Sequence, residues 1–175
     1  NGTMTISGVT ISQNYNVGAA IANSGNLTID GDENEFTTIA ATVRNEEGSD
    51  AVLTINGGKF VQTGTYADNG TLKYNVDARG GEVIIKGGEF TSNNGVLNVM
   101  CEMTIDGGKF YNEVNQAATR HLAYLSTNAN LTVNGGEFEG YANPSAGGAF
   151  FCLASASAKL VLNDGYFASY WLSGN

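Results

Sequence analysis

The chain has 175 residues, enough for one domain with a substantial core. Its 17 acidic and 8 basic residues give a formal net charge of −9. The few Lys and Arg residues are not clustered as phosphate neutralisation requires, and no stretch approaches about eighteen consecutive apolar residues. The composition therefore argues against a nucleic-acid partner, an anionic-membrane partner and membrane insertion.

One phrase recurs along the chain and organises it. Its fullest form is Leu53-Thr-Ile-Asn-Gly-Gly-Lys-Phe60. The other copies, which lie 20 to 30 residues apart, span 4–8, 27–31, 83–90, 103–110, 131–138 and 160–167. An apolar alternation that runs into a Gly-Gly turn and a Phe, repeated at this period, predicts a solenoid.

The alternation within the phrase predicts which side chains are buried. Leu53 and Ile55 point to one face of a strand and Thr54 to the other. Stacked copies then give an inner apolar column of Ile6, Ile29, Ile55, Ile85, Ile105, Val133 and Leu162. A second stack follows the turn, formed by Phe60, Phe90, Phe110, Phe138 and Phe167. The uneven period is typical of β-helix coils whose loops vary in length while the strands stay in register.

Further strands are predicted upstream of the phrase, and the residues after each Phe supply a third side. The upstream strands are expected at Gly18–Ala22, Leu72–Val76, Val96–Met100, His121–Leu125 and Ala149–Leu153. Parallel crossovers are overwhelmingly right-handed. The sequence therefore predicts an all-β fold: a single-stranded, right-handed parallel β-helix of about seven coils of 20–30 residues, with three short strands per coil.

A row of charged residues follows the glycines, one per coil. Lys59, Glu89, Lys109 and Glu137 alternate in sign. Opposite charges on adjacent strands stabilise a sheet by about 0.2–1 kcal/mol per pair, whereas like charges repel. The alternation supports the predicted register and indicates a structural role for the row.

The two cysteines are predicted to be free and buried. Cys101 and Cys152 occupy different places in coils that are two rungs apart. Two rungs correspond to roughly 9–10 Å at the usual strand spacing, which is more than a disulfide spans.

The Gly-Gly-x-Phe coils resemble the repeats of right-handed parallel β-helix proteins of the pectate-lyase-like superfamily. They look most like repeats of bacterial surface proteins and of phage virion and spike proteins, over residues 3 to about 170. The resemblance implies a single β-helix domain over residues 1–175, located outside the cell, on a virion or on a bacterial surface. Because the chain opens at Asn1 within a repeat, we expect a segment of a longer or processed polypeptide. Phage spikes of this kind are often homotrimers.

The resemblance does not carry the superfamily's best-known catalytic motifs. Its polysaccharide lyases place an arginine near an Arg-x-Pro motif, whereas the only proline here, Pro144, has no arginine nearby. Its pectin hydrolases use a Gly-His-Gly segment and an Asp-Asp pair, whereas the one histidine is His121 within Arg120-His-Leu122. We therefore predict no catalytic residue and no cofactor, with carboxylates scattered over several coils as the enzymatic alternative.

The densest acidic stretch, Asp30 to Glu35, is a candidate calcium site. Asp30, Asp32 and Asn34 match the opening oxygen ligands of a calcium loop. Glu35 stands where such a loop needs glycine, and Ala41 stands where it needs a bidentate glutamate. An enlarged, solvated turn is the alternative.

Aromatic residues near the C-terminal end are candidate ligand or partner contacts, because such rings stack on sugars and on apolar partner surfaces. They are Tyr141, Tyr166, Tyr170 and Trp171. The alternative is that these rings cover the open end of the solenoid core.

Three functions remain open from the sequence. The first is a non-enzymatic structural or interaction module that contacts other virion or cell-surface proteins. The second is a carbohydrate-binding adhesin module whose partner is a surface glycan. The third is a polysaccharide lyase or glycosidase.

Overall fold

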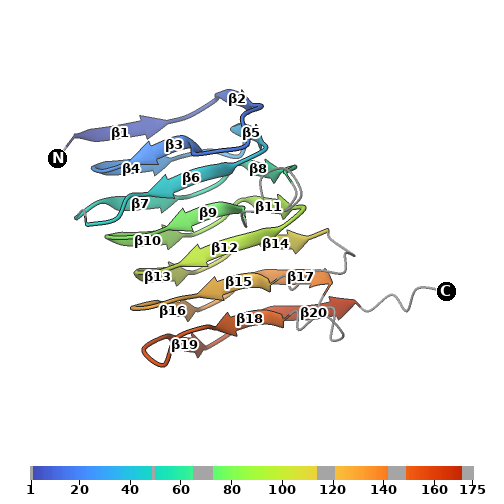
Figure 1. Cartoon of the computed structure of the whole chain (residues 1–175). Coiled ribbons are helices and arrows are strands. Elements are labelled where there is room, and N and C mark those ends of the chain that lie inside the picture. The colour runs from blue at the N-terminus through green and yellow to red at the C-terminus, as the bar shows by residue number, and fades with distance from the viewer. Residues whose placement is uncertain (1, 49, 65–72, 114–120, 142–148, 171–175) are drawn as a thin grey trace.

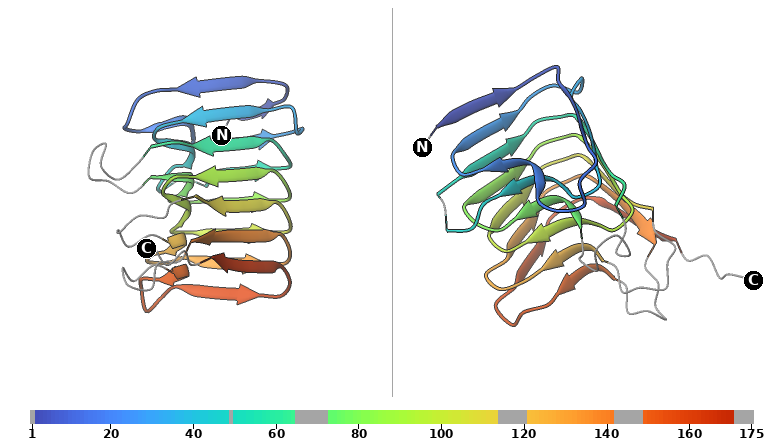
Figure 2. Two further views of the ribbon diagram at one scale, coloured as in Figure 1. Left: turned by 90° about the vertical axis from the view of Figure 1, so that its right-hand side faces the viewer. Right: turned by 45° about the horizontal axis from the view of Figure 1, so that its top comes forward.

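The computed structural model describes residues 2–48, 50–64, 73–113, 121–141 and 149–170. Over these residues the chain is an all-β parallel solenoid with three sheets, which the chain visits in the fixed order A, B, C (Figures 1 and 2). The predicted fold class is confirmed. The predicted count of seven coils is slightly too high, because the described strands form six complete turns and the last copy of the phrase adds only β19 and β20.

Each sheet takes one strand from every turn. Sheet A consists of β1 (Thr3–Ile6), β4 (Asn26–Ile29), β7 (Val52–Ile55), β10 (Glu82–Ile85), β13 (Glu102–Ile105), β16 (Asn130–Val133) and β19 (Lys159–Leu162). Sheet B consists of β2 (Thr10–Gln13), β5 (Glu35–Thr38), β8 (Lys59–Gln62), β11 (Glu89–Ser92), β14 (Lys109–Asn112), β17 (Glu137–Tyr141) and β20 (Tyr166–Tyr170). Sheet C consists of β3 (Ala19–Asn23), β6 (Ala41–Asn45), β9 (Tyr74–Ala78), β12 (Gly95–Val99), β15 (His121–Leu125) and β18 (Ala149–Leu153).

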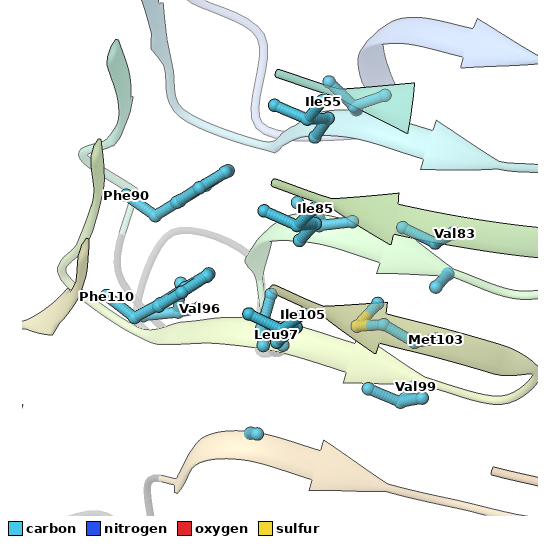
Figure 3. Close-up of a cluster of buried hydrophobic side chains, with 14 of the residues drawn as sticks. Ile55, Val83, Ile85, Phe90, Val96, Leu97, Val99, Met103, Ile105 and Phe110 are labelled. Atoms are coloured by element: carbon cyan, nitrogen blue, oxygen red, sulfur yellow. The ribbon is translucent and has the colours of Figure 1, made fainter. Parts of the chain in front are cut away.

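The predicted apolar column is confirmed residue by residue. The parallel register places Ile55 beside Ile29 on one side and beside Ile85 on the other. Ile55, Ile85 and Ile105 are fully buried and lie one above another (Figure 3). Leu162 belongs to the same column but is 48% exposed. It lies on β19, the last strand of sheet A, so the described residues cover it from one side only.

The aromatic stack runs through sheet B and is longer than predicted. Neighbouring Phe rings from Phe60 to Phe138 lie 4.6–4.9 Å apart, measured between centroids, and their planes differ by at most 8°. Phe36 also belongs to the stack, 4.8 Å from Phe60. The phrase did not reveal Phe36 because two extra residues stand between Leu27 and this position. Phe167 stacks on Phe138 as predicted, although it is 37% exposed on the last strand of the sheet.

The turn between sheets A and B requires glycine. Gly58, Gly88, Gly108 and Gly136 adopt φ values of 104–110°, a region that L-residues with side chains avoid. A Cβ at Gly88 would also lie 3.0 Å from the Gly58 carbonyl oxygen of the preceding turn. The Gly-Gly pair therefore fixes both the corner and the close stacking of successive turns.

The strands of sheet C are less regular in sequence, and their predicted bounds shift accordingly. The expected strands at His121–Leu125 and Ala149–Leu153 are confirmed as β15 and β18. The other three are displaced by one or two residues, and β6 was not predicted. In β12, both Val96 and Leu97 are fully buried, so the strict inside–outside alternation that guides strand prediction is broken here.

Both cysteines are free, as predicted, but only Cys101 is buried. Cys152 is half-buried on β18, so the prediction of burial was wrong for this residue. Burial, together with the nearby charge of Glu102, raises the pKa of the Cys101 thiol to about 11.

Replacing a ring in the middle of the Phe stack tests its contribution. We expect Phe90→Ala to lower the free energy of unfolding by about 3–5 kcal/mol, because the cavity has no means of closing between two stacked neighbours. Urea denaturation followed by far-ultraviolet circular dichroism measures this. The control is Lys86→Ala, an exposed residue of the same turn, which should cost less than about 0.5 kcal/mol. Equal costs for the two variants would contradict the core role of the stack.

Candidate functional site

An open groove follows the Gly-Gly corner along the solenoid axis. Its volume is about 730 Å³, and its lining residues come from consecutive turns: Asp32, Glu35, Gly58, Lys59, Gly87, Gly88, Glu89, Gly108, Lys109, Gly136 and Glu137. We call it the corner groove. Backbone and glycine make up much of its surface, which leaves room beside the charged side chains.

The charged residues that line the corner groove, apart from Asp32, form one continuous row. Parallel pairing sets the first residues of β5, β8, β11, β14 and β17 side by side. We call this row the charge ladder: Glu35, Lys59, Glu89, Lys109 and Glu137. The sequence predicted the last four, and the structure adds Glu35 on the N-terminal side of Lys59. Beyond Glu137 the same register leads to Tyr166.

The charge ladder is exposed along its whole length. Both ion pairs among the described residues lie elsewhere, at Asp77. Neighbouring rungs are separated by about one strand spacing, ~4.8 Å. Alternation therefore supplies favourable electrostatics between rungs, while the charged groups themselves remain accessible from outside.

The three calcium candidates make separate contacts with the protein. Asn34 is fully buried; its Oδ1 accepts from the Val9 amide, and its Nδ2 donates to the Asp30 and Gly31 carbonyl oxygens. Asp30 Oδ1 accepts a hydrogen bond from Asn56 Nδ2. The Asp32 carboxylate lies where a Cβ on Gly57 would collide with it. The Asn34 amide thus organises an enlarged turn.

The described residues contain no group of three or more His, Cys, Asp or Glu placed to hold a metal ion. Calcium binding at Asp30, Asp32 and Asn34 stays a prediction, and the hydrogen bonds of Asn34 account for the local geometry without an ion.

The aromatic candidates are only partly within the described structure. Tyr166 is 55% exposed, one rung beyond Glu137. The backbone of Tyr141 pairs with that of Tyr170, and Trp171 lies outside the described residues. Of this group, the structure connects Tyr166 to the charge ladder.

A second polar site lies on sheet C and was not predicted. Asp77 Oδ2 accepts from Arg44 Nε at 3.0 Å and from Arg79 Nε at 2.9 Å, and Asp77 Oδ1 accepts from Asn98 Nδ2 at 2.7 Å. The Asp77 side chain is only 6% exposed. Arg44, Asp77 and Asn98 are partners in register on β6, β9 and β12.

The Asp77 cluster borders a small pocket. The pocket has a volume of about 170 Å³, and its lining includes Arg44, Arg79, Lys73, Tyr74 and Asp77. Three of the eight basic residues of an acidic chain meet here, against one carboxylate. Sequence reasoning missed the pocket because Arg44 and Asp77 are 33 residues apart. A residue-by-residue alignment of the sheet C strands would have placed them together.

His121 has a structural environment. Its Nδ1 accepts a hydrogen bond from the Ala149 amide at 3.1 Å, and its ring lies 6.0 Å from that of Tyr124. Burial lowers the pKa of His121 below its usual 6.5. The ring is therefore neutral at physiological pH and links β15 to β18.

Comparison with protein families, with curated proteins and with solved structures finds no match in any of the three. In the described part of the chain, no helix is long and apolar enough to cross a membrane. The proposed function therefore rests on the geometry of this chain and on the resemblance of its repeats.

Removing the acceptor of the Asp77 cluster tests its contribution to stability. We expect Asp77→Asn to lower the free energy of unfolding by about 2–3 kcal/mol, because two guanidinium groups then face each other without a carboxylate. This is less than for a fully buried pair, since Arg79 is partly solvated. Urea denaturation measures the change. Glu113→Gln, an exposed change of equal charge, is the control, and equal midpoints for both variants would contradict this role.

Acid should weaken the link made by His121. The unfolded chain binds a proton at this residue near its ordinary pKa of 6.5, whereas the folded chain resists protonation. The contribution of His121 to stability is therefore complete above pH 6.5 and declines as the pH falls below that value. Urea midpoints of wild type and His121→Gln, measured across this range, should differ in their pH dependence. Parallel curves would contradict a neutral, half-buried His121.

Proposed function

We propose that this protein is a non-enzymatic structural and interaction module displayed outside the cell. The settings we favour are a phage decoration, fibre or spike domain, or a bacterial surface protein. The finer placement of the fold, among right-handed parallel β-helices of the pectate-lyase-like superfamily, belongs to the same proposal. Its partners are other virion or cell-surface proteins, and a homotrimer is one assembly that the resemblance suggests.

The observation that carries the proposal is the regular use of repeated positions. On successive turns the same positions supply the Ile column, the Phe stack and the Gly-Gly corner. Six turns at the usual strand spacing give a rod of about 30 Å. The exposed side of the corner repeats as well, as the charge ladder. A rigid rod that presents a periodic charged surface suits protein contacts made along its length.

A specific observation favours carbohydrate binding as the second candidate. The pocket beside Asp77 combines two arginines with Tyr74. Arginine recognises carboxylate groups through its planar fork of donors, whereas Tyr74 is nearly buried and contributes to the wall of the pocket. An acidic sugar is the ligand class that this pocket would accept.

Display outside the cell is tested by antibody labelling. Antibodies raised against the purified chain should label intact virions or intact bacterial cells from the source, as seen by immunogold electron microscopy. Labelling that appears only after the cells are permeabilised would overturn the proposal. Pre-adsorption of the antibodies with the purified chain is the control.

Binding and cleavage of glycans are tested separately. We expect no new reducing ends and no unsaturated products when the chain is incubated with a panel of polysaccharides. Cleavage of any polymer would overturn the non-enzymatic assignment. Retention of acidic glycans on an array, lost in Arg79→Glu and kept in Lys159→Glu, an exposed change of equal charge on β19, would favour the second candidate.

A further inference from the structure

We propose that the corner groove binds a second copy of this chain, giving an antiparallel dimer in which the two charge ladders pair across a two-fold axis. The inference deepens the proposed interaction role and rests on it. It follows from the order of charges along the groove, the glycine floor and the exposure of every ladder residue.

The order of signs makes the charge ladder complementary to its own reverse. Successive rungs carry Glu35, Lys59, Glu89, Lys109 and Glu137. A two-fold axis between two rungs always joins an odd rung to an even one, and therefore an acid to a base. An axis through a rung joins like charges instead. Isologous pairing of this kind is the usual geometry of a homodimer.

The glycines select one axis among those the charges allow. The four rungs with a complete Gly-Gly pair are centred between Glu89 and Lys109. An axis one rung nearer the N-terminus, between Lys59 and Glu89, would set the enlarged Asp30–Asn34 turn against the Gly-Gly floor of the Lys109 rung. The axis between Glu89 and Lys109 instead matches the four Gly-Gly rungs with one another.

With this axis, each ladder residue meets a complementary one in the second copy. Glu89 faces Lys109 of the second copy, and Lys59 faces Glu137 of the second copy, so four ion pairs form in each dimer. At the ends, Glu35 faces the exposed Tyr166 of the second copy, whose hydroxyl can donate to a carboxylate.

The shape of the corner groove admits this arrangement. Gly58, Gly88, Gly108 and Gly136 carry no side chains, and they line the groove beside the ladder. The ladder of each copy is a ridge that fits the glycine floor of the other. Cβ atoms at these glycines would contact the backbone of the preceding turn or the ring of the following Phe, so the floor cannot be filled without disturbing the fold.

The expected dimer is weak and sensitive to salt. Exposed ion pairs contribute about 0–1 kcal/mol each, and added salt screens them. We expect sedimentation velocity to show a monomer–dimer equilibrium that shifts toward dimer as protein concentration rises and toward monomer as salt is added.

Two double variants with the same net charge test the register. Lys59→Glu with Glu137→Lys restores every pair across the proposed axis, so the dimer should persist. Lys59→Glu with Glu89→Lys turns all four ion pairs into like-charge contacts, so the dimer dissociation constant should rise at least tenfold, a change of about 1.4 kcal/mol. The fourfold variant that reverses Lys59, Glu89, Lys109 and Glu137 should dimerise like wild type.

Circular dichroism and urea midpoints show that each variant is folded before its sedimentation is compared. A monomer at all concentrations, a trimer, or equal dissociation constants for the two double variants would overturn the proposal, as would a dimer that survives only in the Lys59→Glu, Glu89→Lys variant. A glycan that binds the groove of a chain that stays monomeric would also overturn it. Antibody labelling of virions or cells does not depend on dimerisation, so failure of the dimer and failure of the proposed function are distinguishable.

Discussion

The close approach of successive turns at the Gly-Gly corner is the constraint on which the rest of the structure depends. Gly88 has a positive φ, and a Cβ at this position would lie only 3.0 Å from the Gly58 carbonyl oxygen. This geometry fixes where sheet A ends and where sheet B begins in the four turns that have a Gly-Gly pair. The corner repeats in register. The Ile before it and the Phe after it therefore each stack on the same residue of the neighbouring turns. The Ile column and the Phe stack are the two results.

Stacking equivalent residues has opposite consequences inside and outside the solenoid. Inside, like side chains are compatible, and rings at separations of 4.6–4.9 Å share flat apolar faces. Outside, a column of identical charges would repel at the same spacing. The first position of sheet B resolves this by alternating Glu and Lys. The sign pattern of the charge ladder is therefore a consequence of the same register that builds the core.

The parts of the fold that carry the repeated phrase could be predicted residue by residue from the sequence, whereas the strands of sheet C, which share no motif, could be predicted only in part. The pairing of Ile55 with Ile85 follows from a shared phrase. The sequence analysis did not place Phe36 in the Phe stack or Glu35 in the charge ladder, because the Asn34 amide supports a turn with two extra residues. The contact of Arg44 with Asp77 joins strands that lack a common motif. Their register follows from aligning the sheet C strands residue by residue, and no shared motif marks that alignment in the sequence.

The two polar sites differ in how far the chain itself satisfies them, and this difference bears on function. Asp77 accepts three hydrogen bonds from its own chain and is nearly buried, so its charge is compensated before any ligand arrives. The ladder residues are exposed, and each has an oppositely charged residue on a neighbouring rung. An alternating row stabilised along one chain remains able to interact with an alternating row on another. Regular stacking thus produces a surface that is electrostatically complementary to its own reverse when the two rows are offset by one rung.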